Sequence, residues 1–528
     1  MLKRHISMLL ALGLIGSTIA GSSSKSTETK TADSSAPKEI VEITQLCFDR
    51  GTIPSAEGTL EENWFSKWAN EKAAKFGVKV KYVPVPNAQR EQKLATMLAS
   101  GEAPDISFTY DPNVISNYTA NGGLADLTSV FDKYGTNLKK KIDQTYIDQV
   151  KINNQITCIP LITNGAVDAT WIRKDWLDKL NLKAPTNIDE FYNVLKEFKE
   201  KDPGKLGDKN MPFALPASTT VSFQNIDTDI LPAFLKSAPT GEQLVTPYYL
   251  WPETKDAVKF LNKLYSEKLM GQFVIDKDGA QIKKKVLTGE LGSTVNFAAY
   301  MYQPAYGNIE ENLQKNMPEA SYIATYPWKA ADSKEQIYDV LKYGINNGMR
   351  FFVPKSSKHP DAAMKYMDFM STDEYVYTLN FGIENKDYKM VDGAPQFVDD
   401  VAKAHCTWVQ PAYQATVSLN ANDDTKFLKF GTTIFNTKFV DQYMKESVAG
   451  DKATKYAIPF IADSKPSSDK YRGDLDKKWD QYLAKMIMGS PADFDKTYDE
   501  AIKTIKAEGG DEVVKEALDL YKKHAVKK

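Results

Sequence analysis

Polar and aromatic side chains follow several predicted strands of this 528-residue chain, where a folded sheet would present them together at one edge. Carboxylate, amide and guanidinium groups exchange hydrogen bonds with hydroxyls, and aromatic rings offer flat apolar faces. A saccharide has hydroxyls around its ring and C–H groups on its faces, so this combination fits a sugar. An unpaired buried polar group costs about 1–3 kcal/mol, so a site with several such groups would discriminate among sugars. The candidate ligand-binding residues are Asp49, Arg50, Tyr110, Asp111, Asn164, Asp168, Trp171, Asn296, Phe297, Trp328, Tyr343, Trp408 and Tyr413.

These candidates have ordinary structural alternatives. An Asp that follows a strand is often only a turn or a helix cap, and this applies to all three candidates of that type. For Trp171, Trp328 and Trp408, position near a strand end is the evidence for exposure in a cleft. Indole rings sealed within the interior would contradict that prediction. The other tryptophans lie on helical stripes or beside turns and are predicted to be structural: Trp64, Trp68, Trp176, Trp251 and Trp479.

Alternating strand and helix patterns must position these residues. Residues 40–48 and 78–83 are predicted as strands, and residues 63–76 and 89–100 as helices. Gly101 supplies the left-handed conformation that commonly ends a helix, and an apolar strand follows it. This alternation predicts an α/β sheet covered by helices, in which ligands bind outside the carboxyl ends of the strands.

One stretch in the middle of the chain is predicted to pass between two structural units. The apolar run 156–162 is followed, after a break of small and polar residues, by a second strand-like run at 166–172. A helix is predicted to begin near Lys174. Thr186 is the predicted N-cap of the next helix, with Glu190 completing a loose capping box. Two strands separated by so short a break indicate a crossing between units.

The rest of the chain continues the same alternation. The predicted elements are a long amphipathic helix at 252–269, a strand at 321–328, a helix opened by Pro360 and Asp361, and a helical C-terminal part from 470 to 528 with an apolar stripe of Trp479, Tyr482, Leu483 and Met486. Two later crossings between units are predicted, one beginning at residue 343 and one between Ala404 and Tyr413.

Several segments resemble those of a known family. They are WIRKDWLDKLNLKAPTNIDEFYNVLKEFKEKDP, LASGEAPDISFTY, VLTGELGSTVNFAAY and FFVPKSSKHPDAAMKYMDFMSTDEY. Together they resemble family 1 extracellular solute-binding proteins of ABC importers, above all the large oligosaccharide-binding lipoproteins similar to alginate-oligosaccharide-binding proteins. This resemblance, which covers nearly all of the mature chain, implies an α/β fold of the two-lobe, periplasmic-binding-protein-like type (type II), with a hinge and an interlobe cleft.

The resemblance implies a division of the chain and a function. The expected parts are a signal peptide at 1–21, a flexible tether at 22–39, an N-terminal lobe at 40–163 and 343–405, and a C-terminal lobe at 164–342 and 406–528. The expected function is to bind an oligosaccharide in the interlobe cleft and to deliver it to the permease subunits of an ABC transporter. We expect no enzymatic activity and no cofactor, and we expect the protein to be a monomer.

Two other functions stay open at this point. A secreted glycoside hydrolase would use two carboxylates about 5–10 Å apart, one of them with a raised pKa. Acidic residues are plentiful here, but no short motif isolates such a pair. A peptide-binding or adhesive surface protein, or a binder of other solutes, is the third possibility.

Composition excludes several classes. The net charge of −2 gives no reason to expect nucleic acid as a partner. The spacing of the three cysteines fits no zinc or redox motif, and the four histidines form no cluster that would bind a metal. In some alginate-binding relatives an acidic calcium loop follows the segment FKEKDP. In this chain Gly204 and Leu206 replace the needed oxygen ligands, so residues 202–208 are predicted to form a polar turn without calcium.

The N-terminus has the pattern of an export signal. Lys3 and Arg4 precede an apolar run at 8–15 that is too short to span a bilayer. Ser22 occupies the place of the lipidated cysteine in a lipobox, and a hydroxyl cannot form the thioether. The Ser-, Thr- and Lys-rich segment that follows is a flexible tether by composition. We therefore expect an extracellular, cell-surface protein that associates with the membrane only if the native residue 22 is a cysteine carrying a lipid anchor.

Overall fold

The structure is a computed structural model that describes most of the chain from residue 40 to residue 525. The described residues are 40–51, 53–161, 168–215, 226, 230–237, 239–271, 280–297, 300–301, 309–325, 348–417, 430, 461 and 463–525. The predicted signal peptide and tether lie outside them, as do three of the candidate site residues: Asn164, Trp328 and Tyr343.

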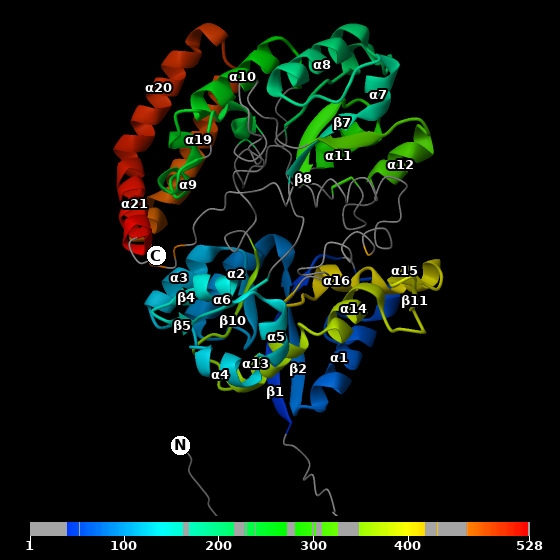
Figure 1. The fold of residues 1–528 in the computed structure, drawn as a ribbon, viewed down its shortest axis with the longest axis vertical. Coiled ribbons are helices and arrows are strands. Elements are labelled where there is room, and N and C mark those ends of the chain that lie inside the picture. Colours follow the sequence, from blue (N-terminus) through cyan, green and yellow to red (C-terminus); the bar gives the residue numbers. More distant parts are fainter. Residues whose placement is uncertain are drawn as a thin grey trace, which may run out of the picture. The chain divides into compact units, whose positions relative to one another are not determined.

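The described residues of 40–161 and 348–417 form one structural unit, here called the first lobe (Figure 1). Strand β1 (Val41–Asp49) pairs in parallel with β2 (Val78–Pro86) along its whole length, and a parallel bridge joins Gln45 to Ile106, directly before β3 (Ser107–Thr109). Strand β10 (Arg350–Phe352) lies antiparallel between β3 and β6 (Ile159–Pro160). The chain therefore returns to the first lobe after residue 348.

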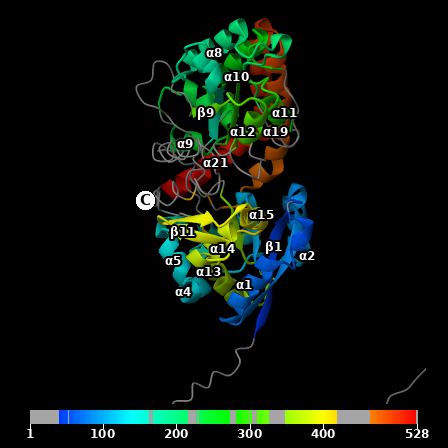
Figure 2. The ribbon, with the colours of Figure 1, turned by 90° about the vertical axis from the view of Figure 1, so that its right-hand side faces the viewer.

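Helices cover both faces of this sheet. Figure 2 shows α4, α5 and α13 on one side of β1 and α2 on the other, which confirms the predicted α/β arrangement. The remaining elements of the lobe are the helices α1 (Trp64–Ala74), α2 (Arg90–Ser100), α3 (Pro112–Ala120), α4 (Thr128–Tyr134), α5 (Thr136–Lys141), α6 (Gln144–Gln149), α13 (Pro360–Phe369), α14 (Asp373–Phe381), α15 (Asp400–Cys406) and α16 (Val409–Ala412), and the strands β4 (Lys151–Ile152), β5 (Gln155–Ile156), β11 (Tyr388–Val391) and β12 (Ala394–Phe397).

A second unit, here called the second lobe, is built on a three-stranded sheet. Its central strand β7 (Asp168–Arg173) lies antiparallel to both β8 (Ser293–Phe297) and β9 (Tyr322–Thr325). The helices of this lobe are α7 (Lys174–Lys179), α8 (Ile188–Lys201), α9 (Gly241–Leu244), α10 (Thr254–Ser266), α11 (Ala280–Leu287), α12 (Ile309–Asn316), α19 (Pro466–Met488), α20 (Phe494–Ile505) and α21 (Asp511–Ala525). No described helix is both long enough and apolar enough to cross a membrane.

Local sequence signals account for most helix boundaries. The Asn63 side chain accepts hydrogen bonds from the N–H groups of Phe65 and Ser66, and this capping box starts α1. Gly101 ends α2 with a φ of +75°, as predicted. One predicted cap is wrong: the side chain of Asn187, and not that of Thr186, caps α8, because it accepts from the N–H of Glu190 at 2.9 Å.

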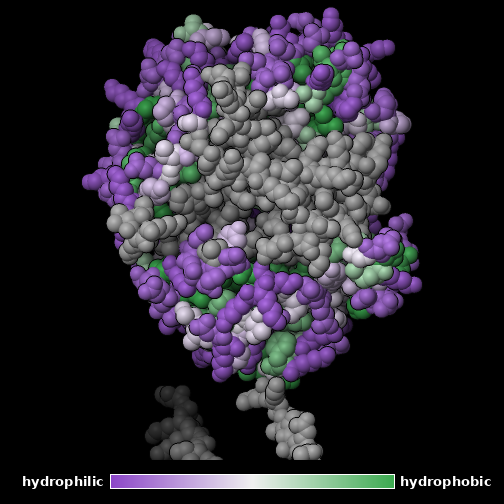
Figure 3. Space-filling model, viewed as in Figure 1, coloured by the Kyte–Doolittle hydropathy of each residue, from purple (hydrophilic) through white to green (hydrophobic). Residues whose placement is uncertain are grey.

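The surface of the described residues is mostly hydrophilic in the view of Figure 3. Hydrophobic residues are visible there over β11 and α15, and the exposed hydrophobic residues on and between these elements are Met390, Val391, Val398 and Val401. All three cysteines, in contrast, are buried and free.

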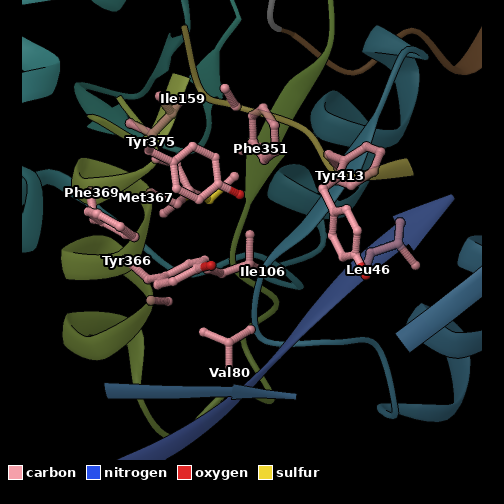
Figure 4. Close-up of a cluster of buried hydrophobic side chains, with 14 of the residues drawn as sticks. Leu46, Val80, Ile106, Ile159, Phe351, Tyr366, Met367, Phe369, Tyr375 and Tyr413 are labelled. Carbon is pink, nitrogen blue, oxygen red and sulfur yellow. The ribbon is translucent and has the colours of Figure 1, made fainter. Parts of the chain in front are cut away.

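The core of the first lobe is rich in tyrosine (Figure 4). The hydroxyls of Tyr82 and Tyr366 lie 2.8 Å apart, and the Tyr375 hydroxyl donates to the carbonyl oxygen of Gln414 at 3.3 Å. Trp408 and Tyr413 belong to the same core, together with Val409, Ala412 and Val417. The predicted assignment of residues 406–417 to the C-terminal lobe is therefore corrected, because their apolar side chains pack in the first lobe.

The second lobe has separate apolar clusters on the two faces of its sheet. Ile172 of β7 faces one cluster, while Ala169 and Trp171 face the other, as the alternation of a strand requires. Helices α10, α19 and α20 pack together on the first of these clusters, as Figure 1 also shows. The predicted apolar stripe of α19 is confirmed by the burial of Trp479, Leu483 and Met486.

A half-buried carboxyl in α19 should make stability depend on pH. Burial and the neighbouring Asp476 carboxylate raise the pKa of Asp480 to about 6, and its buried Oδ1 accepts no hydrogen bond from the described residues. Between about pH 4 and pH 6 the folded state therefore binds a proton that the unfolded chain has lost. The contribution of Asp480 to the free energy of unfolding thus falls as pH rises through this range. We expect Asp480→Asn to raise the free energy of unfolding by about 1–2 kcal/mol near pH 7 and to change it little near pH 4.

Urea unfolding at the two pH values would measure this difference. Asp474→Asn is the matched control, because Asp474 lies on the same helix with its side chain 86% exposed. An equal gain for both variants near neutral pH would show that general charge repulsion, and not the buried Asp480, is responsible.

Candidate functional site

The carboxyl ends of three strands of the first lobe meet at one edge of the sheet. Because β1, β2 and β3 run in parallel, the segments after them emerge on the same side. The structure thus brings together four candidates from two places in the sequence, namely Asp49, Arg50, Tyr110 and Asp111, although roughly sixty residues separate the two pairs. The segment after β2 adds the N-terminus of α2 to this edge, which is called the first-lobe edge below.

The two aspartates at the first-lobe edge serve as caps. Oδ1 of Asp49 accepts a hydrogen bond from the N–H of Gly51 at 2.9 Å, within the turn after β1. Oδ1 of Asp111 accepts from the N–H of Asn113 at 2.8 Å and starts α3. The pKa of Asp111 is raised, chiefly because the surrounding protein displaces water from its carboxyl. The structural alternative for an Asp after a strand therefore describes both residues.

Aromatic rings and guanidinium groups alternate at the same edge. The rings of Phe48 and Tyr110 are stacked, with centroids 6.3 Å apart and an interplanar angle of 21°. The guanidinium carbon of Arg90 lies 5.2 Å from the Tyr110 centroid and 5.8 Å from that of Phe48. That of Arg50 lies 5.6 Å from the Phe48 centroid. Each distance lies within the range of a cation–π contact, which holds the guanidinium groups in place.

Arg90 and Glu91 were missed in the sequence analysis. The Thr109 hydroxyl donates to Oε2 of Glu91 at 2.8 Å, and Nε of Arg90 donates to the other oxygen of the same carboxylate at 3.3 Å. Both residues begin α2, which follows the carboxyl end of β2 after the short turn Asn87–Gln89. The rule that selected Asp49 and Asp111 would have found them if it had been applied to β2 as well.

Arg350 lies buried below the first-lobe edge. Its Nη1 donates to the carbonyl oxygens of Tyr110 at 3.3 Å and Gly348 at 2.8 Å. Burial lowers the pKa of Arg350, and the nearby Cys158 and Asp111 oppose this effect. The guanidinium group thus links β10 to the backbone at the end of β3. No local sequence pattern predicts this role.

The second lobe gathers its candidates in a similar way. In the register of the sheet, Asp168 at the start of β7 lies opposite Phe297 at the end of β8, and Ala169 lies opposite Asn296. Asn296 is half-buried. The backbone positions of Asp168, Asn296 and Phe297 therefore meet at one edge, although about 130 residues separate them in the sequence.

Three aromatic candidates do not lie at either edge. Trp171 is fully buried, Tyr413 is 1% exposed and Trp408 is 5% exposed. The Tyr413 hydroxyl contacts the carbonyl oxygen of Leu60 and accepts a hydrogen bond from Nδ2 of Asn63 at 2.6 Å, so it is used within the core. The prediction that these three rings contact a ligand is wrong. Trp171 lies on a central strand with both faces covered, and the other two pack in the first lobe.

The remaining tryptophans follow the sequence analysis. Trp68, Trp176, Trp251 and Trp479 are buried, and Trp64 packs its ring against His405 with centroids 5.0 Å apart. Residues 202–208 form the polar turn that was predicted, because the Asp202 carboxylate accepts hydrogen bonds from the N–H groups of Leu206 and Gly207. Among the described residues, no group of three or more His, Cys, Asp or Glu side chains is placed to hold a metal ion.

Comparisons with known proteins agree with this architecture. Residues 58–377 match the model of a family described as bacterial extracellular solute-binding protein. The polygalacturonan/rhamnogalacturonan-binding protein YtcQ of Bacillus subtilis is 26% identical over 463 residues, which cover 83% of this chain and 84% of that protein.

Solved structures share the fold at lower identity. The alginate-binding protein AlgQ2, solved without calcium ion, superposes with a TM-score of 0.64 at 21% identity, over 92% of this chain and 98% of the other. The substrate-binding protein FusA of an S. pneumoniae ABC transporter, in complex with kestose, superposes with a TM-score of 0.65 at 17% identity, over 92% of this chain and 100% of the other. These likenesses confirm the predicted two-lobe, periplasmic-binding-protein-like fold.

Proposed function

We propose that this chain, which belongs to the family of bacterial extracellular solute-binding proteins, binds an oligosaccharide and delivers it to the permease of an ABC importer. The observation that carries the proposal is the first-lobe edge, where guanidinium groups and the Tyr110 ring lie together at the carboxyl ends of parallel strands. Guanidinium donors and aromatic faces are the groups that recognise sugar hydroxyls and C–H faces. The carbohydrate names of YtcQ and AlgQ2 support the same class of ligand.

Ligand capture would involve both lobes. The chain passes from the first lobe to the second between residues 161 and 168, back between 325 and 348, and again to the second between 417 and 463. We place the hinge at these three crossings and the ligand between the first-lobe edge and the edge that carries Asn296. A ligand that contacts both edges would favour a closed arrangement, since it binds that arrangement better than an open one.

Delivery rather than chemistry is the role assigned to the chain. The family and the relatives are binding proteins, which supports a carrier without enzymatic activity. The two aspartates at the first-lobe edge are used as caps, so they do not favour a glycosidase pair. The proposal also assigns export to residues 1–21 and a flexible tether to residues 22–39. Association with the membrane would require a lipid on a native cysteine at position 22, and the working form would be a monomer.

A ligand screen tests this function directly. Thermal unfolding of the full chain would be followed with defined neutral and acidic oligosaccharides and with peptides of similar size. A ligand at a hundredfold excess over its Kd should stabilise the protein by about 2.7 kcal/mol. The stabilising sugar, recovered after prolonged incubation, should be chemically unchanged. Stabilisation by peptides alone would reject a sugar carrier, and shortened sugars would identify a hydrolase.

A further inference from the structure

Two arginines share one aromatic ring at the first-lobe edge. The guanidinium carbons of Arg50 and Arg90 lie 5.6 Å and 5.8 Å from the centroid of Phe48, which is itself fully buried. Arg90 also lies 5.2 Å from the Tyr110 centroid. Arg50 comes from the turn after β1 and Arg90 from the first residue of α2, so two separate elements bring a guanidinium group to the same ring. Contact with this fixed ring reduces the freedom that each guanidinium group would lose on binding a ligand.

The hydrogen bonds of these arginines leave donors available. Nε of Arg50 donates to the carbonyl oxygen of Pro411 at 2.9 Å. Nε of Arg90 donates to Glu91 at 3.3 Å, and its Nη1 donates to the carbonyl oxygen of Asn87 at 3.4 Å. Both terminal nitrogens of Arg50 and Nη2 of Arg90 have no partner among the described residues. Arg50 is exposed and Arg90 half-buried, so ligand atoms can reach these groups.

The carboxylates at the first-lobe edge are already used in hydrogen bonds within the protein. Asp49 and Asp111 cap the turn and the helix that follow their strands, and Glu91 holds the Thr109 hydroxyl and Arg90. The formal charges of these three residues balance those of Arg50, Arg90 and Arg350. Recognition of an anion here would therefore use directed hydrogen bonds from the guanidinium groups.

From this arrangement we infer that the oligosaccharide is an acidic one, built from uronate residues, and that Arg50 and Arg90 bind its carboxylates. The inference rests on the proposed function and names the ligand class of the same site. A guanidinium group presents parallel N–H donors that match the two oxygens of a carboxylate, and such charge-assisted bonds are about twice as strong as neutral ones. A neutral sugar offers single hydroxyls, which make no use of this planar geometry.

The test compares an oligogalacturonate of one defined length with its fully methyl-esterified form, which keeps the hydroxyls and removes the charge. Isothermal titration of the full chain should show that the acid binds about 10- to 100-fold more tightly than the ester. Arg50→Gln and Arg90→Gln should each weaken binding of the acid by about the same factor and leave binding of the ester almost unchanged. Arg50→Lys and Arg90→Lys keep the charge but lose the planar donors, so they should restore little affinity.

Lys79→Gln is the matched control, since it removes one positive charge from β2 at the end opposite to Arg90, where its side chain is 60% exposed. It should bind the acid like the wild type. If an arginine variant fails to fold, the acid and the ester still decide the question on the unmodified protein. Equal binding of acid and ester, or full rescue by lysine, overturns the inference and leaves a sugar carrier in place. Binding of no sugar in the wider screen overturns the proposed function itself.

Discussion

Replacing Asp175 by Asn is expected to lower the free energy of unfolding by about 3–5 kcal/mol, because it leaves the Arg173 guanidinium buried without its counter-charge. The two side chains are 3% and 8% exposed. Nε and Nη2 of Arg173 donate to the two oxygens of Asp175 at 2.7 Å and 2.8 Å, so the pair is bidentate. Burial alone would lower the pKa of Arg173, but its bonds to Asp175 outweigh that effect and raise it.

The position of this ion pair explains why its loss should be costly. Nη1 of Arg173 donates to the carbonyl oxygen of Gly289 at 3.0 Å, and its guanidinium carbon lies 4.7 Å from the Trp176 ring centroid. The pair therefore joins the end of β7 to the start of α7 and to the turn before β8. Strands β7 and β8 carry Asp168, Asn296 and Phe297 at their other ends, so we expect a weaker response to ligand as well as lower stability.

The same helix supplies the control. Asp178 pairs with Lys174, and their side chains are 60% and 44% exposed, so Asp178→Asn should change the free energy of unfolding by less than about 1 kcal/mol. Chemical denaturation of the two variants beside the wild type measures both values. If Asp175→Asn unfolds at the denaturant concentration of the control, water must reach Arg173 in the folded protein, which would contradict its burial.

The elements that sequence analysis predicted well are those with a local physical signal. Asn63, Gly101 and the residues around Pro360 set helix ends through caps and backbone geometry, and each does so in the structure. The rule about carboxyl ends of strands also succeeded in bringing Asp49, Arg50, Tyr110 and Asp111 to one edge. Such features depend on a few neighbouring residues, so a pattern of sequence alone can reveal them.

The predictions that were wrong concern features that depend on tertiary structure. A tryptophan in a strand-like run looks the same whether its sheet is covered on one face or on two, so nothing local revealed the burial of Trp171. The extension of the first lobe to Val417 is likewise a property of its core, in which Trp408 and Tyr413 pack against residues far away in the sequence. The shared use of Phe48 by Arg50 and Arg90 required the strand order, which was not known.

Trp171 gives a direct test of its assignment to the core, because a core residue and a ligand-binding residue predict opposite results on substitution. In the structure Trp171 pairs with Thr294 of β8 and Ala324 of β9 and packs with Val286 and Leu313. Truncation of a buried Trp to Ala costs about 3–5 kcal/mol, since it removes apolar contacts and leaves a cavity. We therefore expect Trp171→Ala to lower the free energy of unfolding by that amount. At temperatures where the variant stays folded, its affinity for the ligand found in the screen should be close to that of the wild type.

A ring that stacked on a sugar would behave in the reverse way: stability would hardly change and the affinity would fall by about 10-fold or more. Trp64→Ala is the control, because this tryptophan is half-buried and stacks on His405 at the edge of the first core, so its loss should cost less stability. Thermal unfolding and titration of the three proteins separate the possibilities. A stable Trp171→Ala protein that no longer binds would return Trp171 to the ligand site. A destabilised protein that binds normally would leave recognition to the strand ends, where Arg50, Arg90 and Tyr110 lie.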